Sequence, residues 1–140
     1  MIVASFLHDV GHLLLDEHGG NEDFLAEDKN HEDVGAEYLF EAFPDAVVEP
    51  IRMHIHAKRY LCSTDEVYWS GLSESSKRSF EVQGGKLTQK EAEDFISQPY
   101  AKDAVQLRLW DDQAKKADIV TPDLEFYLSG VVTKILHNTN

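Results

Sequence analysis

The stretch HDVGHLL, residues 8–14, places His8, Asp9 and His12 inside an otherwise apolar N-terminal segment. An imidazole or carboxylate buried in such a segment needs a partner, because an unpaired buried charge is costly. A hydrogen-bonded His8–Asp9 pair and a bound metal ion are two ways to meet that need. Neighbouring residues of a helix point about 100° apart, so the side chains of His8 and Asp9 are poorly placed to bind the same ion. An Asp9 that bridges two ions suits this geometry better.

Outward from this stretch, three further residues of metal-ligand type lie on apolar faces of predicted helices. At a period of about 3.6 residues per turn, His31, His54 and Asp111 each fall in line with apolar side chains of their own segments. The same period puts His56 on a polar, solvated face, and it puts Asp112 where pairing with a cation four residues away accounts for it. We therefore predict that His54 and Asp111 point inward.

The predicted ligand set combines imidazole and carboxylate donors: His8, Asp9, His31, His54 and Asp111. Such a mixture suits iron, manganese, zinc or nickel, and magnesium is a further divalent option. Each residue taken alone has a simpler explanation, as a cap or as a hydrogen-bonded polar group. Because all five lie on the predicted buried faces of helices, a shared metal site explains them better.

The rest of the chain carries helical signals, and the β-branched runs of period two that mark strands hardly appear. Glycines, prolines and a capping box at residues 88–91 mark the helix boundaries. The sequence therefore predicts one all-α bundle of about seven helices without a sheet, over residues 1–140. The expected helical segments are residues 2–15, 31–43, 50–61, 65–72, 73–80, 88–97, 102–119 and 121–137.

Bulk composition narrows the class of protein. The 140 residues are 42% hydrophobic and 28% charged, as in a soluble globular domain, and no apolar run is long enough to span a bilayer. A formal net charge of −13 repels phosphate backbones, so we expect no nucleic-acid partner, although a local basic pocket can still bind a small anion. Cys62 is the single cysteine, so no internal disulfide can form, which favours a reducing, cytoplasmic location.

The order of the predicted ligands resembles the pattern of the HD-domain superfamily. Local sequence narrows the resemblance to its PhnZ-like branch, which contains diiron oxygenases that cleave organophosphonates and which is related to myo-inositol oxygenase. Many members of this branch carry only the label of a predicted HD phosphohydrolase. The segments that carry the resemblance are HDVGHLL at 8–14, HEDVGAEYL at 31–39, RMHIHAKRYL at 52–61, SFEVQGG at 79–85 and LRLWDDQAK at 107–115.

This resemblance implies a centre of two iron ions bridged by Asp9. His8 and Asp111 would form the first metal position, and His31 and His54 the second. In the family, the first position also takes a histidine from a preceding helix, and no residue here matches it. We therefore expect an N-terminally incomplete HD domain in which the first metal position is under-coordinated.

The resemblance also implies roles in binding and converting a phosphonate. The residues that match substrate-holding positions are His12, Lys58, Ser76, Ser79, Gln83 and Arg108. The cations Lys58 and Arg108 lie about one helical turn from predicted ligands, where they can hold a dianion by charge-assisted hydrogen bonds. For Ser76 and Ser79, ordinary use in turns and caps is nearly as good an explanation. The residues expected to act in catalysis are His8, Asp9, His12 and Lys58.

Three functions remain open at this point. The first, which the resemblance favours, is a diiron oxygenase that uses dioxygen to cleave a small hydroxyphosphonate and release phosphate. The second is a phosphohydrolase, in which divalent ions polarise a small phosphate ester or nucleotide. The third is a truncated, non-catalytic helical module, whose uncovered N-terminal face would bind a second copy of the chain as a homodimer.

Overall fold

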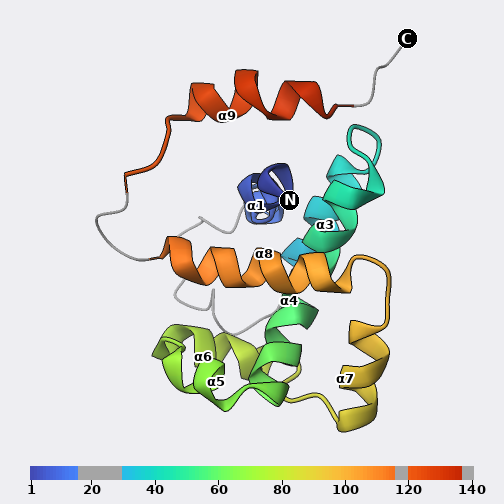
Figure 1. Cartoon of the computed structure of the whole chain (residues 1–140), viewed down its shortest axis with the longest axis vertical. Helices are drawn as coiled ribbons and strands as arrows, with labels where there is room; N and C mark the ends of the chain where they lie inside the picture. Colours follow the sequence, from blue (N-terminus) through green and yellow to red (C-terminus); the bar gives the residue numbers. More distant parts are fainter. Residues whose placement is uncertain (16–29, 116–119, 137–140) are drawn as a thin grey trace.

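The computed structural model describes residues 1–15, 30–115 and 120–136. This part of the chain folds into helices without a strand (Figure 1), which confirms the predicted all-α fold. No helix within the described ranges is long and apolar enough to cross a membrane. The predicted helix ends at residues 119 and 137 lie outside the described residues.

The helices are α1 (Ile2–Leu7), α2 (Val10–Leu14), α3 (His31–Leu39), α4 (Asp45–Thr64), α5 (Glu66–Gly71), α6 (Glu74–Val82), α7 (Gln89–Ile96), α8 (Ala101–Ala114), α9 (Leu124–Gly130) and the 3-10 helix η2 (Val132–Lys134).

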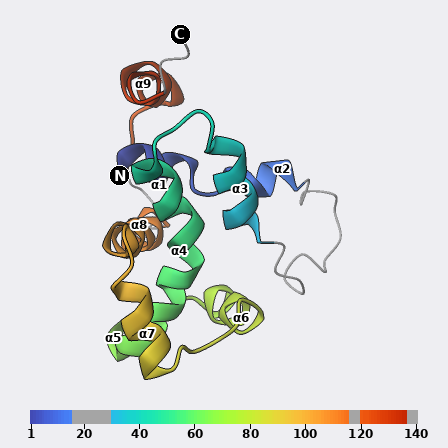
Figure 2. The ribbon, with the colours of Figure 1, turned by 90° about the vertical axis from the view of Figure 1, so that its right-hand side faces the viewer.

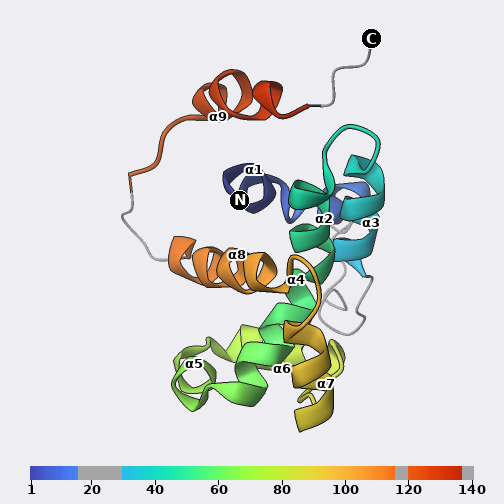
Figure 3. The same cartoon turned by 45° about the vertical axis from the view of Figure 1, so that its right-hand side comes forward.

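Helix α4 is the central element, and it contacts α1, α3, α5, α7 and α8. Figures 2 and 3 show α1 and α3 beside its first half and α5, α6 and α7 around its second half. We predicted that it starts at Pro50, and this is wrong, because the helix begins at Asp45. Val47 and Val48 are buried, and both of their amides donate to the carbonyl of Pro44. The burial of these two valines stabilises helix before Pro50, which then lies inside it.

The main core lies between the four helices α1, α3, α4 and α8, from which most of the predicted metal ligands project. Packing in a protein interior is dense, so this core fixes the helices, and with them the ligands, relative to one another. Its buried members are Val3, Ala4, Ala36, Leu39, Phe43, Val47, Val48, Ile51, Leu107 and Val132.

The predicted single helix over residues 2–15 is two helices that meet at His8 and Asp9. Asp9 has φ −97° and ψ 9°, so the chain turns there and α2 packs on α3. The packing is very close: a Cβ atom on Gly11 would lie 1.9 Å from the carbonyl oxygen of His31. The contact brings the turn at Asp9 to the first residue of α3.

Side-chain caps mark the starts of α7 and α9. The capping box of Thr88 and Glu91 is formed as predicted at the start of α7. The last α-helix was expected to begin at residues 121–122, but Asp123 caps it by accepting a hydrogen bond of 2.9 Å from the amide of Phe126. Helix α9 ends at Gly130, and its Tyr127 ring stacks on Phe6 of α1 with ring centroids 5.2 Å apart.

Candidate metal centre

The structure brings the five predicted ligands together from four parts of the chain. His8 and Asp9 occupy the turn between α1 and α2, and His31 is the first residue of α3. His54 projects from the middle of α4 and is 1% exposed, which agrees with its predicted inward direction. Asp111 projects from α8, with a side chain that is 10% exposed.

The carboxylate of Asp9 lies between two groups of ligand atoms. Its Oδ2 atom is 3.3 Å from His8 Nε2, which is itself 3.6 Å from Asp111 Oδ1. Its Oδ1 atom is 3.7 Å from His31 Nε2 and 4.0 Å from His54 Nε2. Each oxygen of Asp9 therefore faces one of the two ligand groups that the family resemblance implies.

Hydrogen bonds to the backbone turn two imidazoles toward this cluster. His8 Nδ1 lies 2.7 Å from the carbonyl oxygen of Ser5, and His54 Nδ1 lies 2.7 Å from that of Ile51. Since a carbonyl oxygen only accepts, each Nδ1 carries the hydrogen, and each Nε2 presents its lone pair to the cluster when the ring is neutral. Such backbone contacts commonly orient histidines that bind metals.

Two details show that these atoms fit a metal ion. The Nε2 atoms of His31 and His54 lie 3.2 Å apart. Two nitrogens bound at about 2.1 Å to one ion are separated by roughly 3.0–3.4 Å. His8 Nε2 is buried and makes no well-formed hydrogen bond in the described part of the chain, although carboxylate oxygens of Asp9 and Asp111 lie 3.3 Å and 3.6 Å away, so it is a polar atom of the kind that a cation can satisfy.

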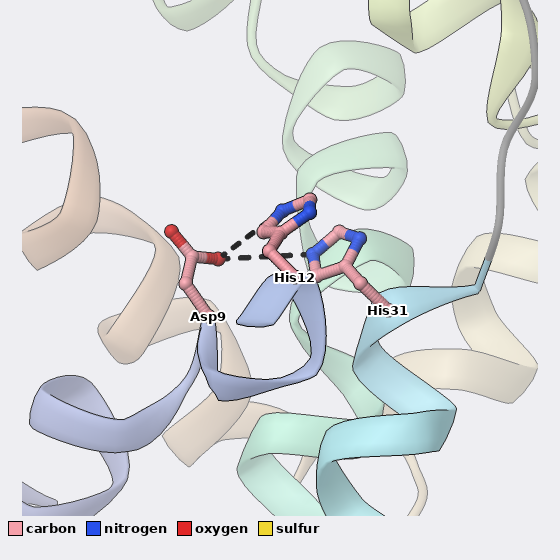
Figure 4. Close-up of side chains that lie close together, drawn as sticks. All are labelled: Asp9, His12 and His31. Carbon is pink, nitrogen blue, oxygen red and sulfur yellow. Dashed lines mark ion pairs between the residues drawn. The ribbon is translucent and has the colours of Figure 1, made fainter. Parts of the chain in front are cut away.

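His12 belongs to the same cluster. Its Nε2 atom is 3.9 Å from Asp9 Oδ1, and its ring stacks on that of His31 with centroids 3.8 Å apart. Figure 4 shows both rings facing one oxygen of Asp9. The ligand atoms of Asp9, His12 and His31 all lie within 4.8 Å of one another, so these three residues can hold an ion. From the sequence we predicted only a catalytic and substrate-binding role for His12, although it lies three residues after Asp9.

The protonation of the cluster follows from burial and from its carboxylates. Burial disfavours the charged form of His8, but the contacts with Asp111 and Asp9 outweigh it and raise its pKa to about 10. Burial, reinforced by the charge of His8, lowers the pKa of His54, so that ring is neutral. Partial desolvation favours the neutral form of Asp9, whose side chain is 56% exposed, but His8 outweighs it and lowers the pKa of Asp9 to about 2. A metal ion would take the place of the proton on His8.

A second cluster surrounds Lys58, one helical turn after His54. Lys58 is 2% exposed, and its Nζ atom donates to Ser79 Oγ at 2.7 Å and to Gln83 Oε1 at 2.9 Å. The structure therefore joins three of the predicted substrate residues. Burial and the nearby charge of Arg108 lower the pKa of Lys58 to about 8, so it remains mainly protonated at neutral pH.

Arg108, the other predicted anion-binding cation, is tied to carboxylates of its own helix. It is 5% exposed, and its Nη1 atom lies 2.9 Å from Asp111 Oδ2. Its Nε and Nη2 atoms donate to Asp112, which is the four-residue pairing predicted for that aspartate. Lys115 also reaches Asp111 Oδ2, at 2.9 Å. Two carboxylates thus neutralise much of the charge that Arg108 could offer to a substrate.

Comparisons with known proteins identify the family. No protein-family model matches the chain. Over 98% of its length, however, the chain is 48% identical to the hydroxymethylphosphonate dioxygenase of Gimesia maris, of which it covers 68%. The chain belongs to the phosphonate dioxygenase family.

Two further relatives extend this picture. The chain is 40% identical to the [1-hydroxy-2-(trimethylamino)ethyl]phosphonate dioxygenase (glycine-betaine-forming) of Leisingera caerulea, over 88% of the chain and 62% of the relative. It is 32% identical to an uncharacterized protein of Acanthamoeba polyphaga mimivirus, over 100% of the chain and 64% of the relative. The chain spans about two thirds of the length of these relatives. The predicted phosphonate-oxygenase branch is confirmed, and the wider HD-domain assignment stays a prediction.

In this member of the phosphonate dioxygenase family, Ser76 and His56 have surroundings that differ from those expected for a substrate-binding serine and a solvated histidine. Ser76 takes part in the start of α6, where its amide and hydroxyl both bond the hydroxyl of Ser73, so the capping explanation describes it well. His56 points away from the metal cluster, as predicted, but it is not solvated. Its half-buried ring stacks on Phe95 with centroids 4.9 Å apart, because α7 packs on that side of α4.

Sequence reasoning missed two polar residues beside the centre. Glu32 is 9% exposed, and its Oε2 atom lies 3.5 Å from His31 Nδ1. Tyr68 of α5 places its hydroxyl between Arg108 and Asp112. The signal for Glu32 in the sequence was an acidic residue directly after the predicted ligand His31. Nothing in the sequence pointed to Tyr68, which is 40 residues from Arg108.

Proposed function

We propose that this chain carries the dimetal centre of a phosphonate dioxygenase that oxidatively cleaves a small 1-hydroxyphosphonate. One observation carries the proposal: the two oxygens of Asp9 face two separate ligand groups, His8 with Asp111 and His31 with His54. The alternative is a His8–Asp9 pair joined by a hydrogen bond without a metal. It would not explain why His31 and His54 lie beside the other oxygen of Asp9. The two named relatives are dioxygenases of hydroxyphosphonates, which favours the oxygenase over the phosphohydrolase.

The residues would hold two iron ions as the resemblance implies, with Asp9 as the bridge. His8 and Asp111 form the first metal position, and His31 and His54 form the second. His12, which lies beside Asp9 and His31, would border the second position and would contact the substrate there, as the resemblance implies. When bound, the iron pair would supply the redox chemistry with dioxygen, and other divalent ions suit the same donors.

Lys58 is the residue best placed to bind the phosphonate group. Both of its contacts are neutral, Ser79 Oγ and Gln83 Oε1, so its positive charge is not cancelled there. An ammonium has three N–H donors, and two of them donate to these partners within the described residues, which leaves one to donate to an anion. Ser79 and Gln83 would hold Nζ in place, while Arg108 would mainly orient Asp111.

The proposed reaction converts a 1-hydroxyphosphonate and one dioxygen into a carboxylic acid and phosphate. The carbon–phosphorus bond breaks, the carbon is oxidised to the carboxylic acid, and dioxygen is the oxidant. For hydroxymethylphosphonate the products are formic acid and phosphoric acid, and this equation balances without another reactant. Glycine betaine, the product in the name of one relative, is also a carboxylate.

Anaerobic loading with iron(II), followed by exposure to oxygen with hydroxymethylphosphonate, tests the proposal. We expect two irons per chain and equal amounts of oxygen consumed and phosphate released. Hydrolysis of a phosphate ester with manganese or nickel, without oxygen uptake, would instead support the phosphohydrolase. A chain that takes up no metal and keeps its stability in a chelator would point to a non-catalytic module.

A further inference from the structure

The hydroxyl of Tyr68 joins α5 to the polar residues of α8. Tyr68 Oη donates to Asp112 Oδ2 at 2.6 Å and accepts from Arg108 Nε at 3.1 Å. The hydroxyl therefore uses its single hydrogen and one lone pair on two charged partners. Burial raises the pKa of Tyr68, so the hydroxyl keeps its hydrogen throughout the neutral range.

Arg108 transmits this contact toward the metal cluster. Its Nη1 atom lies 2.9 Å from Asp111 Oδ2, while Asp111 Oδ1 lies 3.6 Å from His8 Nε2. One oxygen of Asp111 is thus held by the guanidinium, and the other faces the first metal position. A guanidinium is a planar, rigid fork, so holding its Nε edge at Tyr68 and Asp112 also sets the direction of Nη1.

The other cation on Asp111 is less able to set its direction. Lys115 contacts the same Oδ2 atom, but its side chain is 55% exposed, whereas that of Arg108 is 5% exposed. Exposed lysine pairs are weak, because solvent screens them and the long side chain loses entropy. The orientation of Asp111 therefore depends mainly on Arg108 and on the groups that hold it.

We propose that Tyr68 is a positioning residue of the metal centre, which acts through Arg108 to keep Asp111 Oδ1 directed at the first metal position. This inference rests on the proposed function, since it needs a metal at His8 and Asp111. It assigns α5 a role in the centre, although no residue of α5 is among the predicted ligands. The role belongs to the hydroxyl alone, because the ring packs with the separate buried cluster of Cys62, Leu72 and Phe80.

Tyr68→Phe tests this role, because it removes the hydroxyl and keeps the ring. Tyr60→Phe is the matched control: Tyr60 is a half-buried tyrosine of α4 whose ring packs on Phe95 of α7. Anaerobic titration with iron(II) should show that Tyr68→Phe binds one of the two irons about tenfold more weakly, the lower end for lost outer-shell contacts. The other iron should bind as in the unchanged chain, and Tyr60→Phe should bind both normally.

Asp112→Asn is a second test of the contacts that link Tyr68 through Arg108 to Asp111. It removes the negative charge of the carboxylate to which Tyr68 and Arg108 both donate. We expect it to weaken the same iron, and the double variant to lose less than the sum of the two losses. Thermal unfolding of the metal-free variants shows whether each one folds. Unchanged iron binding in Tyr68→Phe, or an equal loss of both irons, would overturn the role of Tyr68 whatever Asp112→Asn does, because Asp112 also contacts Arg108 directly. If the unchanged chain itself binds no iron, the proposed function is wrong, and the role of Tyr68 is wrong with it.

Discussion

Gly11 and Gly35 bring helices α2 and α3 into direct backbone contact. A Cβ atom on Gly11 would lie 1.9 Å from the carbonyl oxygen of His31 and 3.0 Å from the amide nitrogen of Gly35. A Cβ atom on Gly35 would in turn lie 3.1 Å from the amide nitrogen of Gly11. Side chains at these positions would push α2 away from α3. The absence of side chains therefore lets Asp9, at the start of α2, come within reach of His31.

Gly11→Ala should separate the two helices, because the added methyl group meets backbone atoms that cannot rotate away. We expect the free energy of unfolding to fall by about 2 kcal/mol or more, in the range of overpacked sites, and iron uptake to fall with it. Urea unfolding and iron titration measure the two effects. Gly71→Ala is the control, since a Cβ there meets nothing within 4 Å. Equal stability of the two variants would contradict the close approach.

The positions of several candidate ligands followed from helical period alone. His54 and Asp111 share faces with apolar neighbours, and both point into the cluster. The period also separated His54 from His56, which lies on Phe95 at another face of α4. It could not show that His12 joins the cluster, because that depends on how α2 packs against α3. That Lys58, Ser79 and Gln83 belong to one substrate site was implied only by the family resemblance, and their hydrogen bonds to one another were not predicted.

The helix boundaries that the sequence misplaced were set by tertiary contacts. Pro50 marks a helix start in an isolated chain, but burial of Val47 and Val48 extends α4 before it. The break at Asp9 carries no proline, and Gly11 lies two residues beyond it. That break depends on contact between Gly11 and α3, which no local pattern reveals.

His54→Ala should remove iron from the second metal position, whereas His56→Ala should leave both irons bound. His54 Nε2 lies 3.2 Å from His31 Nε2, while the His56 ring stacks on Phe95. Iron analysis after anaerobic reconstitution distinguishes the two. His56→Ala should lower thermal stability slightly through the lost stacking. Equal iron loss in both variants would refute the assignment of His54 as a ligand.

Lys58→Met should impair substrate binding more than turnover, because methionine keeps the apolar stem but has no charge. We expect KM for hydroxymethylphosphonate to rise about 100-fold, as when a buried hydrogen-bonded charge is lost, with full iron content. Lys102→Met, a change on the exposed side of α8, is the control. A normal KM in Lys58→Met would show that another residue binds the phosphonate group.

The same lysine should affect stability at alkaline pH. Burial lowers the pKa of Lys58 to about 8 in the folded chain, from an ordinary value of 10.5. Between these values the unfolded chain holds a proton that the folded chain has released, so stability rises with pH across this window. Lys58→Met should lack this rise. Urea unfolding of the unchanged chain and of Lys58→Met is measured from pH 7 to 11. The difference between their free energies of unfolding isolates the contribution of Lys58 from that of other titrating groups. If the two free energies change with pH in parallel, the pKa of Lys58 is not lowered.

Asp9→Asn separates a bridging aspartate from an ordinary ligand. Asparagine keeps the shape of the side chain but loses the charge and one of the two oxygens that face His8 and His31. In the proposed centre both metal positions share Asp9, so we expect both irons to bind weakly. Asp111→Asn changes a residue of the first position alone, and one iron should remain. Iron titration of the two variants gives the answer: if Asp9→Asn keeps one iron at full affinity, Asp9 serves a single ion and the two-metal arrangement is wrong.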